Sequence, residues 1–363
     1  MSKVRPIAIY LPQYHPIPEN DQAWGSGFTE WNNVKKAAPV FEGHYQPHVP
    51  HESVGYYDLR DPEVMVKQAT MAKEHGIYGF AYYHYWFNGK RLLNLPIDNM
   101  LRTGKPDFPF CYIWANENWT KRWDGEDNEI IIKQEYSFED DRKHICFLCE
   151  NVFSDKRYIT VDNKPLFIVY KPFLFPDIKK TIEIWKDEVS KTIYKEIYIV
   201  SMDNFLMGQK PDKLGFEATI HFQPDYRLFK NRLSGDIFSR FLHRFKIKES
   251  PFKKNTIYDY EEYLNLSLKF YSEIDHKCYP GIMPGWDNSA RRKKGALIFS
   301  NSTPEKYKNW LVSILNIFKG FNDEENFIFL NAWNEWAEGN HLEPCNNWTD
   351  KYLYYTKEVL EST

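Results

Sequence analysis

Eight short runs rich in β-branched and aromatic residues recur along the chain and alternate with segments of helical periodicity. Several runs are almost continuously apolar, which is typical of strands that are buried on both faces of a parallel sheet. The expected strands are 6–11, 77–84, 109–115, 166–170, 197–202, 216–222, 279–283 and 327–333, and the expected helices are 62–75, 138–152, 178–191, 258–274, 304–319 and 347–361. This alternation predicts an α/β fold, a (β/α)8 TIM barrel, with a doubly wound open sheet as the alternative.

The chain is predicted to form a single catalytic domain, 1–363, because it has no internal repeat and no Gly/Ser linker. The polar segment 12–60 is rich in Pro, His, Trp and Tyr, and we expect it to be an elaborated loop after the first strand that lies over the barrel mouth. Residues 226–257 hold nine Lys and Arg against two Asp and Glu, which predicts a solvated helical face. No Gly-x-Gly-x-x-Gly follows the first strand, so the sequence does not support a dinucleotide-binding fold.

Charge and hydropathy exclude several partners. The formal net charge of −3 argues against an overall attraction to nucleic acid. No apolar run approaches the ~20 residues that span a bilayer, so no transmembrane segment is expected. The first apolar run is also shorter than the h-region of a secretory signal, which predicts a soluble, cytoplasmic protein.

The cysteine and histidine patterns predict neither a disulfide framework nor a metal site. The five cysteines are odd in number and scattered, and the single Cys-x-x-Cys, Cys146 and Cys149, has no second ligand pair. A histidine-rich run, 44–51, is interrupted by Pro47 and Pro50, which keep it extended, so its imidazoles are not expected to converge. We therefore expect no metal and no cofactor.

Aromatic residues are unusually frequent, at 17% of the chain, with 12 Trp, 25 Tyr and 26 Phe. Many stand beside Asn, Glu, His and Gln, as in the run from Tyr82 to Trp86. Sugars present apolar C–H faces and a rim of hydroxyl groups, which match aromatic platforms and polar side chains respectively. The composition therefore favours an oligo- or polysaccharide substrate.

Active sites of (β/α)8 barrels lie at the carboxyl ends of the strands. Polar or aromatic residues follow every expected strand, and we take them, with residues of the 12–60 loop, as candidates for substrate binding. They are Tyr14, His15, Trp31, His44, Gln46, Tyr83, His84, Trp86, Trp114, Asn116, Glu117, Trp119, Tyr170, His221, Trp286, Asp287, Arg291, Trp333, Asn334 and Trp336.

The motif after the eighth expected strand supplies the catalytic candidates, Glu335 and Glu338. Residues three apart on a helical turn share one face, with Cβ atoms about 5–6 Å apart. Two close carboxyls beside indole rings cannot both ionise easily, so one becomes an acid and the other stays a base. Cleavage of a glycosidic bond needs such a pair. The alternative is two exposed loop glutamates.

Two further charged residues have open interpretations. Glu117 either binds a sugar hydroxyl or forms an ion pair with Arg122. Arg291 begins four consecutive cations after the seventh expected strand, and loops there often hold phosphate. It is predicted either to clamp a carboxylate, sulfate or phosphate group of the substrate or to belong to a solvated basic turn before Gly295.

Seven motifs are spread over almost the whole chain: 11–16 (LPQYHP), 27–31 (GFTEW), 43–48 (GHYQPH), 55–59 (GYYDL), 83–87 (YHYWF), 114–119 (WANENW) and 333–336 (WNEW). Together they resemble the motifs of the WbsX-type family. The family accompanies polysaccharide and lipopolysaccharide biosynthesis, and its members are often labelled glycosyltransferases. It is similar to glycoside hydrolase family 99, endo-acting α-mannosidases and α-mannanases that are (β/α)8 barrels.

Family 99 carries the pattern Asn-Glu-Trp-x-Glu-Gly near its last strand, which residues 334–339 match. The resemblance implies that Glu338 is the general acid/base. It also implies that Glu335 deprotonates the sugar 2-hydroxyl, which then attacks the anomeric carbon to give a 1,2-anhydro sugar and an outcome of retention. Because the N-terminal half departs from family 99, mannose specificity is not implied.

The sequence thus predicts a glycoside hydrolase-like enzyme that cleaves a bacterial surface or related polysaccharide, and the resemblance to family 99 implies endo action. One alternative is a glycosyltransferase of lipopolysaccharide, O-antigen or capsule biosynthesis, although no Asp-x-Asp motif or nucleotide-binding pattern supports it. The other is a non-catalytic glycan-binding protein, against which the intact carboxylate pair argues, because binding alone needs no acid and base.

Overall fold

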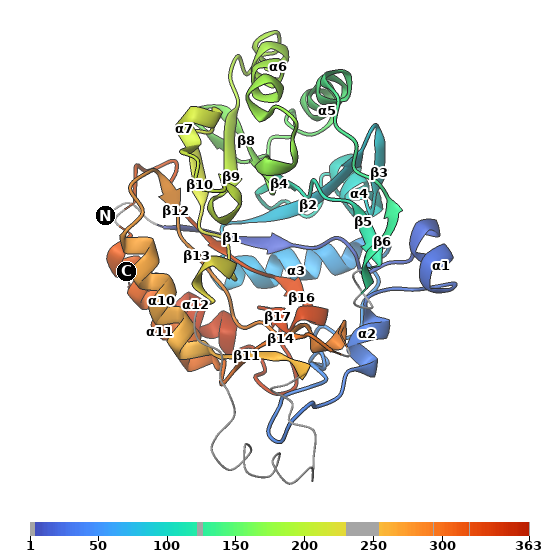
Figure 1. Ribbon diagram of the computed structural model, residues 1–363, viewed down its shortest axis with the longest axis vertical. Coiled ribbons are helices and arrows are strands. Elements are labelled where there is room, and N and C mark those ends of the chain that lie inside the picture. Colours follow the sequence, from blue (N-terminus) through green and yellow to red (C-terminus); the bar gives the residue numbers. More distant parts are fainter. Residues whose placement is uncertain (1–3, 122–125, 230–253, 293, 319, 363) are drawn as a thin grey trace.

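The computed structural model describes residues 4–121, 126–229, 254–292, 294–318 and 320–362. Its main sheet is a parallel barrel with helices around it (Figure 1). Around the barrel the strands are β1 (Arg5–Tyr10), β2 (Gly79–Phe87), β4 (Phe110–Trp114), β8 (Lys164–Val169), β9 (Tyr198–Met202), β10 (Ala218–Ile220), β12 (Cys278–Tyr279) with β13 (Gly281–Ile282), and β15 (Phe327–Leu330). This arrangement confirms the predicted (β/α)8 barrel.

The barrel closes through a seventh strand that a proline divides into β12 and β13. β12 pairs with β10, and β13 pairs with β15. Pro280, between them, has no N–H to donate, but its carbonyl accepts from the backbone N of Phe329 at 2.9 Å. Pro280 therefore removes only one backbone hydrogen-bond donor from the sheet, and the strands still form a continuous ring.

The outer helices agree with the expected segments, and their ends carry capping residues. They are α3 (Pro62–Glu74), α5 (Phe138–Asn151), α6 (Ile178–Ser190), α10 (Tyr260–Ser272), α11 (Pro304–Ile317) and α12 (Lys351–Ser362). The side chains of Asp61, Ser137 and Thr303 accept from backbone N–H groups in the first turns of α3, α5 and α11.

The structure differs from the expected elements in several places. Helix α4 (Leu95–Thr103) was not expected, although Pro96 in its first turn and Gly104 just beyond its end are typical helix boundaries. The crossover between β9 and β10, where no helix was expected, contains a short 3-10 helix (Asp203–Phe205) and the four-residue α7 (Pro211–Leu214). β15 ends at Leu330, because the next residues turn into the short β16 (Asn334–Glu335). The basic segment 226–257 lies mostly outside the described residues, so its predicted helical face is not observed.

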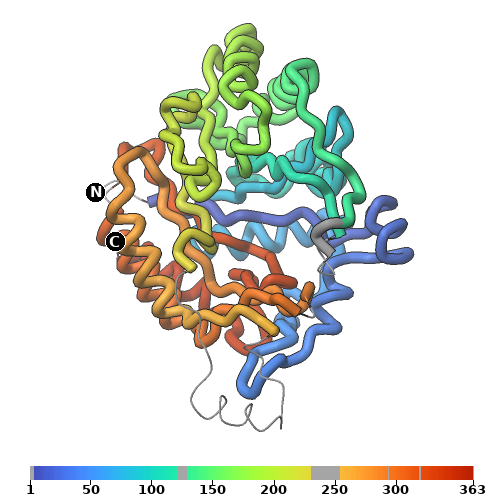
Figure 2. The backbone as a smooth tube through the Cα atoms, in the orientation of Figure 1, coloured from blue at the N-terminus to red at the C-terminus, as the bar shows by residue number. Residues whose placement is uncertain are grey.

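The segment after β1 covers the carboxyl ends of the strands, as expected. It contains α1 (Pro18–Trp24) and α2 (Trp31–Lys36), and α2 contacts the turns that follow the seventh and eighth strands. Figure 2 shows this blue segment beside the orange and red C-terminal part of the chain. Among the described residues, no helix has the length and apolar character needed to cross a membrane.

A buried carboxyl group holds the eighth strand end in place. Glu343 is 1% exposed and accepts four hydrogen bonds: from Tyr57 Oη at 2.9 Å, Gln68 Nε2 at 2.6 Å, Trp333 Nε1 at 3.0 Å and Trp336 Nε1 at 2.7 Å. Burial raises the pKa of Glu343 to about 7, while these donors favour the ionised form. Since a carboxylate has about four acceptor positions, all of them are filled. Glu343 thus joins the 12–60 loop and α3 to the tryptophans beside the catalytic candidates.

Two buried imidazoles connect β2 to α5. His84 Nε2 and His144 Nε2 lie 3.0 Å apart, so one ring donates and the other accepts. Burial lowers the pKa of His84 to about 3 and that of His144 well below its usual value of 6.5. Both rings are therefore neutral in the folded protein at neutral pH.

Replacing Glu343 by glutamine should destabilise the fold. In either orientation of the new glutamine, its NH2 group faces two hydrogen-bond donors. A buried N–H group therefore loses its acceptor, at a cost of about 1–3 kcal/mol. Urea unfolding followed by tryptophan fluorescence measures this loss. The control Glu361→Gln, on the exposed end of α12, should change stability little. Equal stabilities of the two variants would contradict the proposed anchoring role of Glu343.

The histidine pair should make stability depend on pH. In the unfolded chain a histidine binds a proton near pH 6.5, whereas His84 binds one only near pH 3. Between these values the unfolded state holds the extra proton, so the free energy of unfolding falls as the pH falls.

His144→Gln removes one of these groups. The stability difference between wild type and this variant should shrink by about 1 kcal/mol as the pH is lowered from 6 to 5. Ile145→Val, at a buried position of the same helix, lacks a titratable group and should show a pH-independent difference. A constant difference for His144→Gln would contradict the prediction.

Candidate active site

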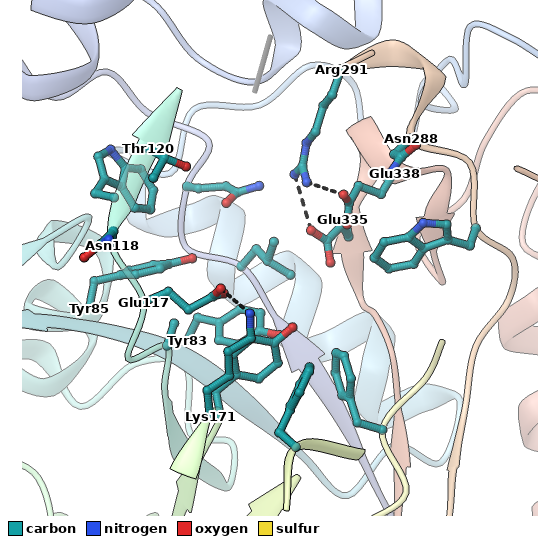
Figure 3. Close-up of a pocket in the computed structure, with 18 of the residues that line it drawn as sticks. Tyr83, Tyr85, Glu117, Asn118, Thr120, Lys171, Asn288, Arg291, Glu335 and Glu338 are labelled. Carbon is teal, nitrogen blue, oxygen red and sulfur yellow. Dashed lines mark hydrogen bonds and ion pairs between the residues drawn. The ribbon is translucent and has the colours of Figure 1, made fainter. Parts of the chain in front are cut away.

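The carboxyl ends of the barrel strands surround a cavity of about 460 Å³ (Figure 3). Residues at or after the carboxyl end of each barrel strand line this cavity, as expected for this fold. Its walls are formed by Leu11, Gln13, Tyr83, Tyr85, Ala115, Glu117, Asn118, Trp119, Thr120, Tyr170, Lys171, Phe205, Phe222, Tyr226, Trp286, Asn288, Arg291, Arg292, Glu335 and Glu338.

Glu335 and Glu338 meet in this cavity around one guanidinium group. Arg291 Nη1 lies 2.6 Å from Glu338 Oε1, and Nη2 lies 3.3 Å from Glu335 Oε1 (Figure 3). All three residues are less than 10% exposed. The alternative of two exposed loop glutamates is therefore not what the structure shows.

The turn that carries Glu338 requires the glycine after it. Gly339 has φ +57°, and a Cβ atom there would lie 3.1 Å from Asp287 Cβ and 3.3 Å from the His48 ring. Tyr14 holds the same turn, because its hydroxyl donates to the Asn334 carbonyl at 2.7 Å and accepts from the Trp336 N–H at 3.0 Å. The backbone therefore fixes the two carboxyl groups relative to each other.

A third carboxyl group, which the sequence analysis missed, completes the cluster. Glu30 is 0% exposed, and its two oxygens accept from Arg291 Nε and from Gln13 Nε2. It stands in the quoted motif 27–31, but its partner Arg291 is 261 positions away. No local spacing connects the two residues, so only the fold reveals the contact.

The cluster has more carboxyl groups than cations. Burial raises the pKa of Glu335 well above its usual value, and the charge of Glu338 and a hydrogen bond with it add to this effect, while Arg291 opposes it. Burial also raises the pKa of Glu30, again opposed by Arg291. A site that keeps a proton beside an ionised carboxylate has the acid and the base that a glycosidic bond needs for cleavage.

The opposite wall carries an ion pair between Glu117 and Lys171 (Figure 3). Asn116 positions it, because its amide group accepts from Lys171 N and donates to Lys171 O, both at 2.8 Å. The expected partner Arg122 lies outside the described residues. Glu117 thus lines the cavity and also forms an ion pair, with a lysine that the sequence analysis did not select.

Aromatic rings line much of the remaining cavity. Tyr83, Trp119, Tyr170 and Trp286 were expected there, and they do line it. Other rings were missed: Tyr85, Phe205, Phe222 and Tyr226. Phe205 directly follows the two polar residues after β9, so its place near a strand end was the available signal.

Many of the expected binding residues are buried behind the cavity wall. In β2, Tyr83 and Tyr85 line the cavity, whereas His84 contacts His144 and Trp86 Nε1 donates to Asp140 at 3.0 Å, both on α5. The reason is that successive side chains of a strand point to opposite faces. The expected residues that do not line this cavity are Tyr14, His15, Trp31, His44, Gln46, His84, Trp86, Trp114, Asn116, His221, Asp287, Trp333, Asn334 and Trp336.

Some of these residues surround a second cavity, of about 630 Å³, on the other side of Gly339. Asp287 Oδ2 accepts there from His44 Nε2 at 2.7 Å and from Gln46 Nε2 at 2.5 Å. His44 Nδ1 accepts from the Val40 N–H at 3.1 Å, so Nε2 carries the ring proton. Trp286 lines both cavities.

In the described part of the chain, one group of side chains brings together three potential metal ligands. Asp203, His276 and Cys278 have ligand atoms within 4.8 Å of one another, outside the residues that line the cavity. Both oxygens of Asp203 already have partners at 2.7 Å, His276 Nε2 and Arg227 Nη2. The guanidinium beside this carboxylate opposes the binding of a cation.

Comparisons with solved structures identify the same fold in glycoside hydrolases. The GH99 endo-alpha-mannosidase from Bacteroides thetaiotaomicron matches with a TM-score of 0.57 and 14% identity, covering 99% of this chain and 97% of that one. A structure described as a glycoside hydrolase-like protein matches with a TM-score of 0.61 and 15% identity, covering 99% and 94%. At these identities the likeness establishes the fold.

Two curated relatives are proteins named WxcX from Xanthomonas campestris pv. campestris. The protein from strain B100 is 37% identical over 368 residues, and that from strain ATCC 33913 is 36% identical. The match covers 98% of this chain but 49% of each relative, so the chain spans about half their length. The family model described as Glycosyltransferase WbsX matches residues 6–356. The chain therefore belongs to the WbsX glycosyltransferase family.

Proposed function

We propose that this carbohydrate-active protein cleaves a glycosidic bond in a bacterial surface or related polysaccharide, with Glu335 and Glu338 as its catalytic pair. One observation carries the proposal. The two carboxyl groups come together around Arg291 in a buried site at the mouth of a barrel of the family 99 type.

The proposed mechanism retains the anomeric configuration. Glu338 gives its proton to the leaving oxygen as the C1–O bond breaks, while Glu335 takes the proton of the sugar 2-hydroxyl and O2 bonds to C1. Water then opens the resulting 1,2-anhydro sugar, giving one proton to Glu338 and its hydroxyl group to C1, while O2 regains the proton from Glu335. Each carboxyl group ends in its starting protonation state.

The spacing of the pair supports this mechanism. The two carboxyl groups hydrogen-bond each other and share one guanidinium. Inverting enzymes instead separate their carboxyls by about 6.5–9.5 Å to hold a water molecule between them. This mechanism requires the proton of the pair to lie on Glu338 when a sugar 2-hydroxyl approaches Glu335.

The cavity walls favour an uncharged sugar at the cleavage point. The rings of Tyr83, Tyr85 and Trp286 offer flat faces for C–H groups, and Glu117 with Lys171 offers partners for hydroxyls. Arg291 lies in the cavity, as expected, but three carboxyl groups of the protein occupy its guanidinium. We therefore propose that it positions the catalytic pair and does not clamp an anionic substrate.

The family description favours a second candidate, a glycosyltransferase. The same pair supports transfer if the hydroxyl of an acceptor sugar, in place of water, opens the anhydro intermediate. A panel of bacterial polysaccharides, incubated without any nucleotide sugar, separates the two. New reducing ends support hydrolysis, products with extended chains support transfer, and a requirement for a nucleotide sugar contradicts both versions of the mechanism.

Glu338→Gln and Glu335→Gln should each lower the cleavage rate by about 10²–10⁴-fold, because general acid–base catalysis contributes this much. Both variants should still bind the glycan, since the ring-lined walls are unchanged. Reducing-end assays and calorimetric titration measure the two effects. Glu361→Gln, far along α12, serves as the control. Near-normal rates for Glu338→Gln would show that another residue is the acid.

A substrate that lacks the 2-hydroxyl at the cleavage point should resist cleavage, because the attacking oxygen is missing. Proton NMR of the first product formed from the ordinary substrate should show the starting anomeric configuration. Turnover of the 2-deoxy substrate at the ordinary rate, or a product of inverted configuration, would eliminate participation of the 2-hydroxyl.

A further inference from the structure

Glu30 is the least accessible member of the carboxyl cluster. It stands directly before α2, is 0% exposed, and is absent from the walls of the cavity. Its oxygens are occupied by Arg291 Nε and Gln13 Nε2. A substrate in the cavity therefore does not reach Glu30, and any influence of Glu30 on the reaction passes through Arg291.

The three nitrogen atoms of Arg291 are divided among three carboxyl groups. Nε faces Glu30, Nη1 faces Glu338 at 2.6 Å, and Nη2 faces Glu335 at 3.3 Å. The planar guanidinium presents its donors in a fixed fork, so the bond at Nε sets how the other two edges meet the catalytic pair.

Several other ionisable groups lie around the Glu335–Glu338 pair. Tyr14, Tyr83 and Tyr85 face the cluster, and burial raises the pKa of each of these phenols above its usual value, so they remain neutral. Across the cavity Glu117 is paired with Lys171. Beyond Gly339, Asp287 is hydrogen-bonded to His44 and Gln46. Arg292 lines the cavity as a second guanidinium.

One guanidinium cannot neutralise three buried carboxylates, and burial makes an uncompensated negative charge costly. We propose that Glu30 is a positioning residue that engages Arg291 and thereby keeps one proton on the Glu335–Glu338 pair at neutral pH. Only the effect of this proton on catalysis rests on the proposed function. The proton itself is measurable without a substrate.

Glu30→Gln tests the charge and preserves the shape. The new amide oxygen still accepts from Arg291 Nε, and Gln13 accepts from the new amide N–H if its own amide group turns over. With the charge of Glu30 removed, the full guanidinium charge acts on the catalytic pair. The pair should then lose its proton at a pH about one to three units lower, the shift that a nearby opposite charge produces.

Infrared difference spectra of the free protein, recorded against pH, report the C=O stretch of the protonated carboxyl. The double variant Glu335→Gln/Glu338→Gln identifies the band of the pair by its loss. We expect the midpoint of this band to move to lower pH in Glu30→Gln and to stay in place in Glu361→Gln. An unchanged or raised midpoint in a folded Glu30→Gln protein overturns the inference.

Arg291→Gln provides a test of opposite sign and covers the case in which Glu30→Gln does not fold. Removing the cation should move the midpoint of the band to higher pH, and an unchanged midpoint overturns the inference. With an identified substrate, the high-pH limb of kcat/KM should move in Glu30→Gln by the same amount as the infrared midpoint. The two proposals can fail separately. If the pH midpoint of the infrared band moves but neither the wild type nor any variant cleaves a glycan, the proposed function fails and the inference about the proton stands.

Discussion

The contact between one buried arginine and three buried carboxyl groups holds the mouth of this barrel together. Arg291 comes from the turn after the seventh strand, Glu30 from the loop after the first, and Glu335 and Glu338 from the turn after the eighth. Removing Arg291 would leave these carboxyl groups without a counter-charge away from water, which is costly. The same contact therefore joins the 12–60 loop to the turns that carry the catalytic candidates.

Buried polar groups with filled hydrogen bonds lie next to this cluster. Glu343 receives four donors, two of them from the indoles of Trp333 and Trp336. Asn334 exchanges two hydrogen bonds with the backbone of Leu11, at 2.8 and 3.1 Å. The motif around the proposed catalytic pair is thus largely a support structure, in which the tryptophans and the asparagine fix the turn and the two glutamates face the cavity.

The fold and the family name suggest opposite reactions on glycans. Barrels of this type occur in glycoside hydrolases, whereas the family is described as a glycosyltransferase family. Fold alone does not decide function, because unrelated activities share the same barrel. The two descriptions become compatible if a retaining carboxyl pair forms an intermediate that either water or an acceptor sugar can open.

The sequence by itself determined the barrel, the place of its mouth and the catalytic candidates. Its strands are continuous apolar runs, and Glu335 and Glu338 are close along the chain, so local patterns were sufficient. The tertiary structure decided the role of the β2 residues. Tyr83 and His84 point to opposite faces of the strand, and which of them faces the cavity depends on where the barrel axis lies. Glu30 and Arg291 also needed the structure, because 261 positions separate them and only the closed loop excludes water from their contact.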